Sequence, residues 1–247
     1  MDDLTNKKID KKARQKIATV KKSEKKLIET AAKQERKLNN FLISVFLPTL
    51  DIKDGRIINT TNNLKKVNTA ASLKKFLKNV INENILKTYL KGFSDINKNT
   101  ANLYDLFDPP KATKNRIFNR SEIISDGFLT ELFDNNEVQK EIQGTFRNAI
   151  TTESKVSDLK NLLSEQIKGT DKKMGVLEGF HYSQGKNEFQ AYTRGLDVEF
   201  SKALKLNYFI YQGGKINTTR DFCDERNGGT FTREEVEDWQ GLTWQGK

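Results

Sequence analysis

The feature that most constrains the fold is a long apolar repeat near the N-terminus. Apolar residues recur there at alternating spacings of four and three, with Glu24 and Gln34 as polar interruptions: Ala13, Ile17, Val20, Leu27, Ala31, Leu38, Phe41 and Val45. This heptad spacing predicts one long amphipathic helix that ends near Pro48. The apolar seam can pack along its own domain, pair with another helix in a coiled coil, or belong to an arm that orders on binding.

The middle of the chain predicts further helices with little strand. Asp54-Gly55 predicts a turn beside a short strand at Ile57-Ile58. Helical periodicity covers about residues 64–93, 121–148, 157–168 and 187–205. The expected apolar faces include Leu73, Phe76, Leu77, Val80, Ile81, Ile85, Leu86, Tyr89, then Ile123, Ile124, Phe128, Leu129, Leu132, Phe133, Val138, Ile142, then Leu159, Leu162, Leu163 and Ile167. Asp108-Pro109-Pro110 is the strongest internal break, and residues 134–136 predict a second one.

The composition suits long solvated helices better than a dense globule. Of 247 residues, 35% are hydrophobic and 31% are charged. One cysteine excludes an internal disulfide and is typical of a reducing site of synthesis. The longest apolar stretch, residues 41–47, is too short for a membrane span, and charge from Asp2 onward predicts no signal peptide.

Positive charge is concentrated at the N-terminus. Residues 1–40 contain 13 Lys or Arg against 6 Asp or Glu, whereas residues 216–247 contain 4 against 7, within a chain of net charge +10. The candidate DNA- or partner-facing side chains are Lys7, Lys8, Lys11, Lys12, Arg14, Lys16, Lys21, Lys22, Lys25 and Lys26. They can neutralise phosphates without reading bases, or simply keep the helix soluble. No aromatic residue lies between them, which disfavours base stacking.

The C-terminal segment predicts a small α+β unit. Residues 206–211 form a short apolar, aromatic run typical of a buried strand. Gly213-Gly214 favours a tight turn and Asn227-Gly228 a hairpin. Thr232 with Glu235 predicts a capping box that starts a helix carrying Trp239.

This segment resembles the C-terminal signature of the Mu F-like phage head-morphogenesis family, the minor head proteins. The matching residues are Tyr208, Tyr211, Gly213, Gly214, Thr219, Arg220, Phe222, Cys223, Arg226, Asn227, Gly228, Phe231, Thr232, Glu235 and Trp239. A preceding helix with Phe189, Tyr192 and Phe200 is similar too, so the resemblance covers about residues 185–247. Family members commonly continue into a Gly-rich stretch and a Cys-Arg-His triplet, which these 247 residues do not contain.

The resemblance implies a non-enzymatic virion component that is associated with the portal or the capsid interior. Such a protein acts in head morphogenesis, DNA packaging or DNA delivery, and passes through the host cytoplasm during assembly. Its partners would be portal or capsid proteins through the C-terminal unit, and packaged double-stranded DNA or an acidic protein surface through the basic segment. Self-association through the N-terminal helix is a further expectation. The alternative is a sequence-nonspecific nucleic-acid-binding protein without a virion role.

The residues that could support catalysis do not form a recognisable site in sequence. His181 is the only histidine, and we expect it to be solvent-exposed or to cap a helix rather than to act in catalysis. One cysteine and one histidine fall short of a closed zinc site, so Cys223 is predicted to be a small buried hydrophobe. Arg220 is expected to make a local ion pair that sets the turn.

Acidic residues are concentrated near the C-terminus, where they could bind Mg²⁺: Asp221, Asp224, Glu225, Glu234, Glu235, Glu237 and Asp238. Glu234 and Glu235 suit the first turn of a helix, which favours a structural interpretation. We therefore predict no catalytic, cofactor or metal-binding residue, and regard a hydrolase or nuclease as the least favoured function.

The expected fold is mainly α, in three parts. Residues 1–48 form a basic amphipathic helical arm, and residues 49–170 form a helical region with a break near residues 108–110. Residues 171–247 form the Mu F-like unit of strand, hairpin and helix.

Overall fold

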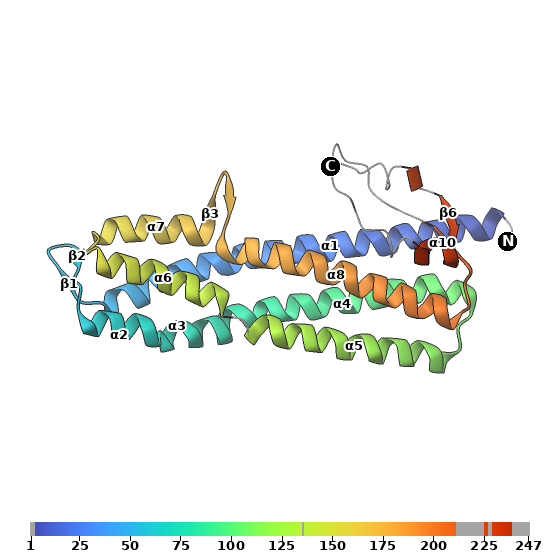
Figure 1. The fold of residues 1–247 in the computed structure, drawn as a ribbon, viewed down its shortest axis with the longest axis horizontal. Coiled ribbons are helices and arrows are strands. Elements are labelled where there is room, and N and C mark those ends of the chain that lie inside the picture. The colour runs from blue at the N-terminus through green and yellow to red at the C-terminus, as the bar shows by residue number, and fades with distance from the viewer. Residues whose placement is uncertain (1–2, 135, 211–224, 227–228, 239–247) are drawn as a thin grey trace.

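The long N-terminal helix predicted from the heptad spacing is α1, Asp3–Phe41, and it sets the length of the molecule. The computed structural model describes residues 3–134, 136–210, 225–226 and 229–238. In Figure 1, α1 runs along most of an elongated bundle whose other helices lie roughly parallel to it. The fold is mainly α, as the sequence predicts.

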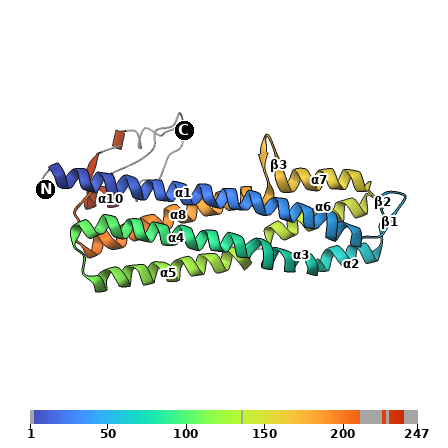
Figure 2. The same cartoon turned by 180° about the vertical axis from the view of Figure 1, so that it is seen from behind.

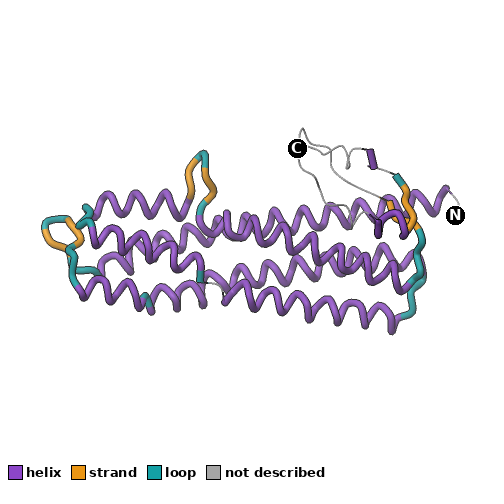
Figure 3. The backbone as a smooth tube through the Cα atoms, in the orientation of Figure 1, coloured by secondary structure: helices purple, strands orange, loops and turns teal. Residues whose placement is uncertain are grey.

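The helices from α1 to α8 are connected by short turns and strand pairs (Figure 3). The α-helices are α2 (Thr61–Thr69), α3 (Ala71–Phe76), α4 (Glu83–Tyr104), α5 (Lys111–Asp134), α6 (Glu137–Thr151), α7 (Val156–Lys168), α8 (Val176–Ala203) and α10 (Arg233–Asp238). The π- and 3₁₀-helical segments are η1 (Leu42–Phe46), η2 (Leu47–Thr49), η3 (Leu77–Asn82) and η4 (Asp105–Phe107). The antiparallel strand pairs are β1 (Ile52–Lys53) with β2 (Arg56–Ile57), β3 (Gly169–Thr170) with β4 (Lys173–Met174), and β5 (Tyr208–Ile210) with β6 (Thr230–Thr232).

The α1 helix is an integral part of the bundle rather than a projecting arm. It packs along α4 and α8 in one half of the molecule and against α7 in the other. In the first half, α4 and α8 lie beside α1 and α5 packs against both of them, whereas α2, α3, α6 and α7 lie in the second half (Figures 1 and 2). Of the three interpretations of the seam, the structure therefore shows packing within its own chain.

The seam changes register where α1 ends. Leu38, Leu42 and Phe46 are buried in succession, whereas Val45, which the heptad spacing places in the seam, is 53% exposed. The cause is the π-helical turn η1, because a π-helix carries more residues per turn than an α-helix and so rotates the following side chains. The prediction for Val45 is therefore wrong.

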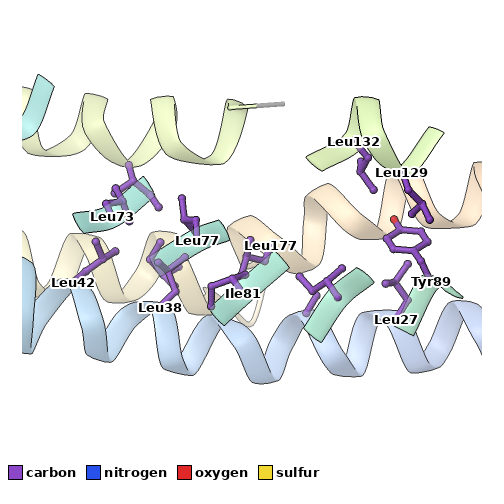
Figure 4. Packing of buried hydrophobic residues seen from close by; sticks show 14 of the residues in the cluster. Leu27, Leu38, Leu42, Leu73, Leu77, Ile81, Tyr89, Leu129, Leu132 and Leu177 are labelled. Carbon is purple, nitrogen blue, oxygen red and sulfur yellow. The ribbon is translucent and has the colours of Figure 1, made fainter. Parts of the chain in front are cut away.

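The partner surface of this part of α1 has the same spacing. Leu73, Leu77, Ile81, Ile85 and Tyr89 are buried at intervals of four residues, through the π-helical segment η3. Figure 4 shows several of these side chains meeting Leu27 and Leu38 of α1 and Leu42 of η1, with Leu177 of α8 beside them. The single helix expected over residues 64–93 is divided at Ala70, whose φ of 37° is left-handed.

The strongest turn signals are confirmed. Asp54 and Gly55 both have positive φ between β1 and β2, as a two-residue hairpin turn requires. Asp108 is left-handed before Pro109 and Pro110, and the chain reverses there between α4 and α5. Because α4 and α5 pack together, this break is a helix connection rather than a boundary between domains.

The inward face of α5 differs from the predicted one. Ile123 and Ile124 are 71% and 58% exposed, whereas Ser121 and Ser125 are buried. Ser121 and Ser125 share the face of Ile117 and Leu129, which contact the core, so the helix turns its two adjacent isoleucines outward. Leu162 of α7 is also exposed, at 48%, against expectation.

Among the described residues, we find no helix with the length and apolar character needed to cross a membrane.

The close packing of α4 on α8 depends on Gly92. A Cβ atom at this position would lie 2.6 Å from the Phe189 ring, and Phe189 is fully buried. Gly92→Ala should therefore destabilise the fold by about 1–3 kcal/mol through overpacking. Gly144→Ala is the matched control, because nothing lies within 4 Å of its Cβ position on α6, and it should stabilise by about 0.5–1 kcal/mol. Urea denaturation of both variants tests this, and equal stability changes would contradict it.

Candidate nucleic-acid interface

The basic residues of the N-terminal segment lie mostly on the outward face of α1. Lys7, Lys8, Lys11, Arg14, Lys21, Lys22, Lys25 and Lys26 are exposed, and Lys12 is half-buried. The same face continues through Lys33, Arg36 and Lys37, which are also exposed and which the sequence pattern did not single out. We call the exposed basic residues from Lys7 to Lys37 the basic stripe. At 1.5 Å per residue it extends for about 45 Å.

Few carboxylates interrupt the basic stripe. Arg14 is paired with Asp10 one turn earlier at 2.8 Å, and both side chains are well exposed. Among the residues of α1 whose exposure the structure describes, Glu29 is the other exposed acid on this face. Exposed ion pairs of this kind contribute little free energy to stability, because water and salt screen the two charges. The basic stripe can therefore bind an extended polyanion through phosphate contacts alone.

Lys16 is the exception among the predicted partner-facing residues. It is 6% exposed and its ammonium group contacts both carboxylate oxygens of Asp197 on α8. The hydroxyl of Tyr104 on α4 donates to Asp197 Oδ1 at 2.9 Å. Burial and the Asp197 charge raise the pKa of Tyr104, so it remains a donor. The prediction that Lys16 faces DNA or a partner is therefore wrong. Lys16 lies on the side of α1 that faces the bundle, and its contact with Asp197 and Tyr104 links α1, α8 and α4.

His181 is buried, so the prediction that it is exposed or caps a helix is wrong. The reason is that α8 begins at Val176, well before the expected start near residue 187, so His181 lies inside the helix. It packs against Tyr89, Phe133 and Phe180. Burial lowers the pKa of His181 to about 4, so the imidazole is neutral near pH 7.

The surroundings of His181 do not form a catalytic triad. Its Nδ1 lies 3.4 Å from the Tyr89 hydroxyl. Within the part of the chain that the structure describes, it makes no hydrogen bond to a serine, a cysteine or a carboxylate. The described geometry therefore supplies no activated nucleophile at this position.

A second buried titratable group, Glu35 of α1, holds the N-terminal end of α8. The Glu178 backbone N–H donates to Glu35 Oε1 at 2.8 Å, which satisfies one of the free donors of the first helical turn. The residue before α8 is Gly175. A Cβ atom at this position would collide with the Glu35 carboxylate, which favours glycine there. Burial raises the pKa of Glu35 to about 7, and the nearby Glu178 charge adds to the effect. Local sequence patterns give no sign of this contact, because its two halves are far apart in the chain.

The described part of the C-terminal signature forms the expected strand and helix. In the β5–β6 pair, Phe209 lies opposite Phe231 and Tyr208 opposite Thr232. The capping box is confirmed: Glu235 N–H donates to Thr232 Oγ1 at 3.2 Å, and Thr232 N–H donates to the Glu235 carboxylate at 2.6 Å. The strand is not buried as predicted, because Tyr208 is 68% exposed. Arg226 Nη1 lies 3.4 Å from Glu225 Oε2.

The other signature residues lie outside the described residues: Tyr211, Gly213, Gly214, Thr219, Arg220, Phe222, Cys223, Asn227, Gly228 and Trp239. The hairpin expected at Asn227-Gly228 and the interpretations of Arg220 and Cys223 stay predictions. So does the acidic cluster as a whole, because Asp221 and Asp224 are likewise outside. The described residues contain no group of three or more His, Cys, Asp or Glu side chains placed to bind a metal ion.

Comparison with known proteins returned no matching family model, curated protein or solved structure. The resemblance to the Mu F-like family therefore rests on the residues of the C-terminal signature.

The buried carboxyl of Glu35 should make stability depend on pH. Its pKa is about 7 in the folded chain against 4.5 for the ordinary group, so its contribution is full below pH 4.5 and is lost as pH rises through 7. Glu35→Gln keeps an oxygen acceptor for the Glu178 N–H and does not titrate. Between pH 4.5 and 7.5 the unfolding free energy of the wild type should fall by about 3 kcal/mol more than that of the variant. Urea denaturation across this range measures the difference, and parallel curves would show that Glu35 does not titrate as stated.

Proposed function

We propose that this chain is a non-enzymatic minor head protein of a phage virion, associated with the portal or the capsid interior. In this role it acts in head morphogenesis, DNA packaging or DNA delivery. The observation that carries the proposal is the C-terminal signature, from Tyr208 to Trp239, preceded by the aromatic residues of α8. Each part of the signature is common, but their order and spacing together are typical of the Mu F-like family.

The arrangement of the surfaces supports a protein with two different partners. The basic stripe lies along the bundle, whereas β5, β6 and α10 contact one another after α8 ends at Ala203. The strands and α10 lie at the same end of the bundle as the N-terminus of α1 (Figure 1). Residues 216–247 carry more acid than base, opposite in sign to the stripe. Under this proposal the C-terminal unit binds portal or capsid subunits, and the stripe faces packaged DNA.

A second candidate is a sequence-nonspecific nucleic-acid-binding protein without a virion role. The basic stripe favours it, because an exposed row of Lys and Arg over about 45 Å binds any duplex of sufficient length. The two candidates differ in whether the protein is incorporated into particles, and the next experiment separates them.

Incorporation tests the virion role. The full chain and a chain ending at Leu206, which keeps the bundle through α8, would each be expressed with the capsid and portal proteins of the same phage. Mass spectrometry of purified particles should detect the full chain and not the shortened one, while circular dichroism shows both to be helical. If the shortened chain enters particles at the wild-type level, the bundle carries docking. If neither enters, the virion role fails and the second candidate remains.

Salt dependence tests the stripe. Deleting residues 1–40 is unsuitable because α1 carries part of the core, so charge is removed instead by Lys11→Gln, Lys22→Gln and Lys33→Gln together. Each lost phosphate contact should lower the slope of log K against log salt by about 0.9, so the triple variant should lose about 2–3. The control neutralises three exposed lysines on other helices, Lys98, Lys140 and Lys160, and should leave the slope unchanged. Binding to a duplex would be measured by filter binding. If both triple variants have the same slope of log K against log salt, the basic stripe is not part of the interface.

A further inference from the structure

A groove between α1 and α8 brings cations and an aromatic ring together that are far apart in sequence. Its volume is about 390 Å³, within the roughly 300–1,000 Å³ range of sites for small ligands. Lys21 and Lys25 of the basic stripe line one side, and Tyr182 and Lys186 of α8 line the other. The Lys186 ammonium lies 5.7 Å from the centre of the Tyr182 ring. The groove therefore offers a tyrosine ring that has the Lys186 ammonium over one face, with positive charge on both sides of the groove.

His181 contributes a buried hydrogen-bond donor to the same groove. The residue lines the groove yet is only 3% exposed. If Nδ1 carried the proton, the hydroxyl hydrogen of buried Tyr89 would lack an acceptor among the described residues, which is costly. The Tyr89 hydroxyl therefore donates to Nδ1, and the proton of the neutral ring resides on Nε2. No hydrogen bond from Nε2 occurs within the described part of the chain.

The groove also contains two carboxylates, Glu24 and Glu29. Glu24 is engaged by Gln190, whose amide donates to it at 3.2 Å. Three lysines against two glutamates leave a small positive excess, which suits one phosphate rather than a row of them. A single phosphate beside an exposed aromatic ring matches one nucleotide unit, because every base has a face that can stack on tyrosine.

We propose that the α1–α8 groove binds one nucleotide unit of a single-stranded nucleic acid. The base stacks on Tyr182, and the phosphate lies between Lys21, Lys25 and Lys186. The His181 Nε2–H donates to an oxygen of the ligand. This inference rests on the nucleic-acid contact in the proposed function and adds a preference that the basic stripe alone lacks, since a duplex does not present an unstacked base.

The test measures binding of the full chain to two fluorescein-labelled probes at several salt concentrations. One is a 20-nucleotide thymidylate strand (~20 nucleotides spans the site sizes of known single-strand binders), and the other is a strand of the same length made of abasic units. Tyr182→Leu should weaken binding of the thymidylate strand by about tenfold and leave binding of the abasic strand unchanged. Tyr208→Leu is the matched control, because Tyr208 is exposed and lies outside the groove, and it should change neither affinity.

Two further variants probe the phosphate and the buried donor. Lys186→Gln should weaken both probes more than Lys98→Gln, which removes an exposed lysine elsewhere. His181→Phe fills the same aromatic environment without the N–H and should weaken both probes, with thermal unfolding used to confirm that it folds. The Tyr182 result decides the proposal even if the His181 variant does not fold, because Tyr182 is exposed.

Each outcome separates the groove from the wider interface. If wild type binds both probes and Tyr182→Leu weakens them equally or not at all, the nucleotide groove is overturned while the stripe stands. If wild type binds neither these probes nor a duplex at any salt concentration, the nucleic-acid contact of the proposed function fails with it. If wild type binds the thymidylate strand more tightly than the abasic strand and Tyr182→Leu loses this difference in affinity, the nucleotide groove is supported.

Discussion

The structure depends on the packing of one helix, α1, against α4 and α8. Leu27, Ala31 and Leu38 of its seam are fully buried, and each buried leucine contributes about 1.5–3 kcal/mol. Close approach is possible because glycines face bulky side chains across the interface. A Cβ at Gly185 would collide with Leu27, and one at Gly92 with the ring of Phe189. The apolar seam of α1, which would otherwise suit a coiled coil, is thus buried against helices of the same chain.

Two polar contacts, each with one buried side chain, restrict how α1 and α8 can align. Lys16 meets Asp197 and Glu35 meets the first turn of α8. A slip of either helix would leave a charge or a helix end buried without a partner, which costs more than the contact itself contributes. Because the seam and these contacts face inward, most other lysines of α1 face outward. The basic stripe and the proposed interface are therefore consequences of how the core is built.

The sequence by itself determined the features that local interactions control. The apolar spacing from Ala13 to Leu38 predicted α1, since a helix of that length needs only a continuous amphipathic pattern. The Asp54-Gly55 turn and the Thr232–Glu235 capping box depend on residues within three positions of each other. The break before α5 follows from the fixed φ of proline and the restriction that it places on the preceding residue. The mainly α fold follows from these signals.

Only the tertiary structure decided which side of each helix is covered and which distant residues meet. Val45 and Ile123 are apolar yet exposed, because a π-helical turn and the neighbours of α5 set the buried face. His181 is buried because α8 begins as early as Val176. Glu35, which is distant in sequence, accepts a hydrogen bond from the first turn of α8. Tyr182 meets the basic stripe only across the α1–α8 groove. Periodicity constrains a helix and its apolar side, whereas burial and pairing depend on contacts that have no trace in local spacing.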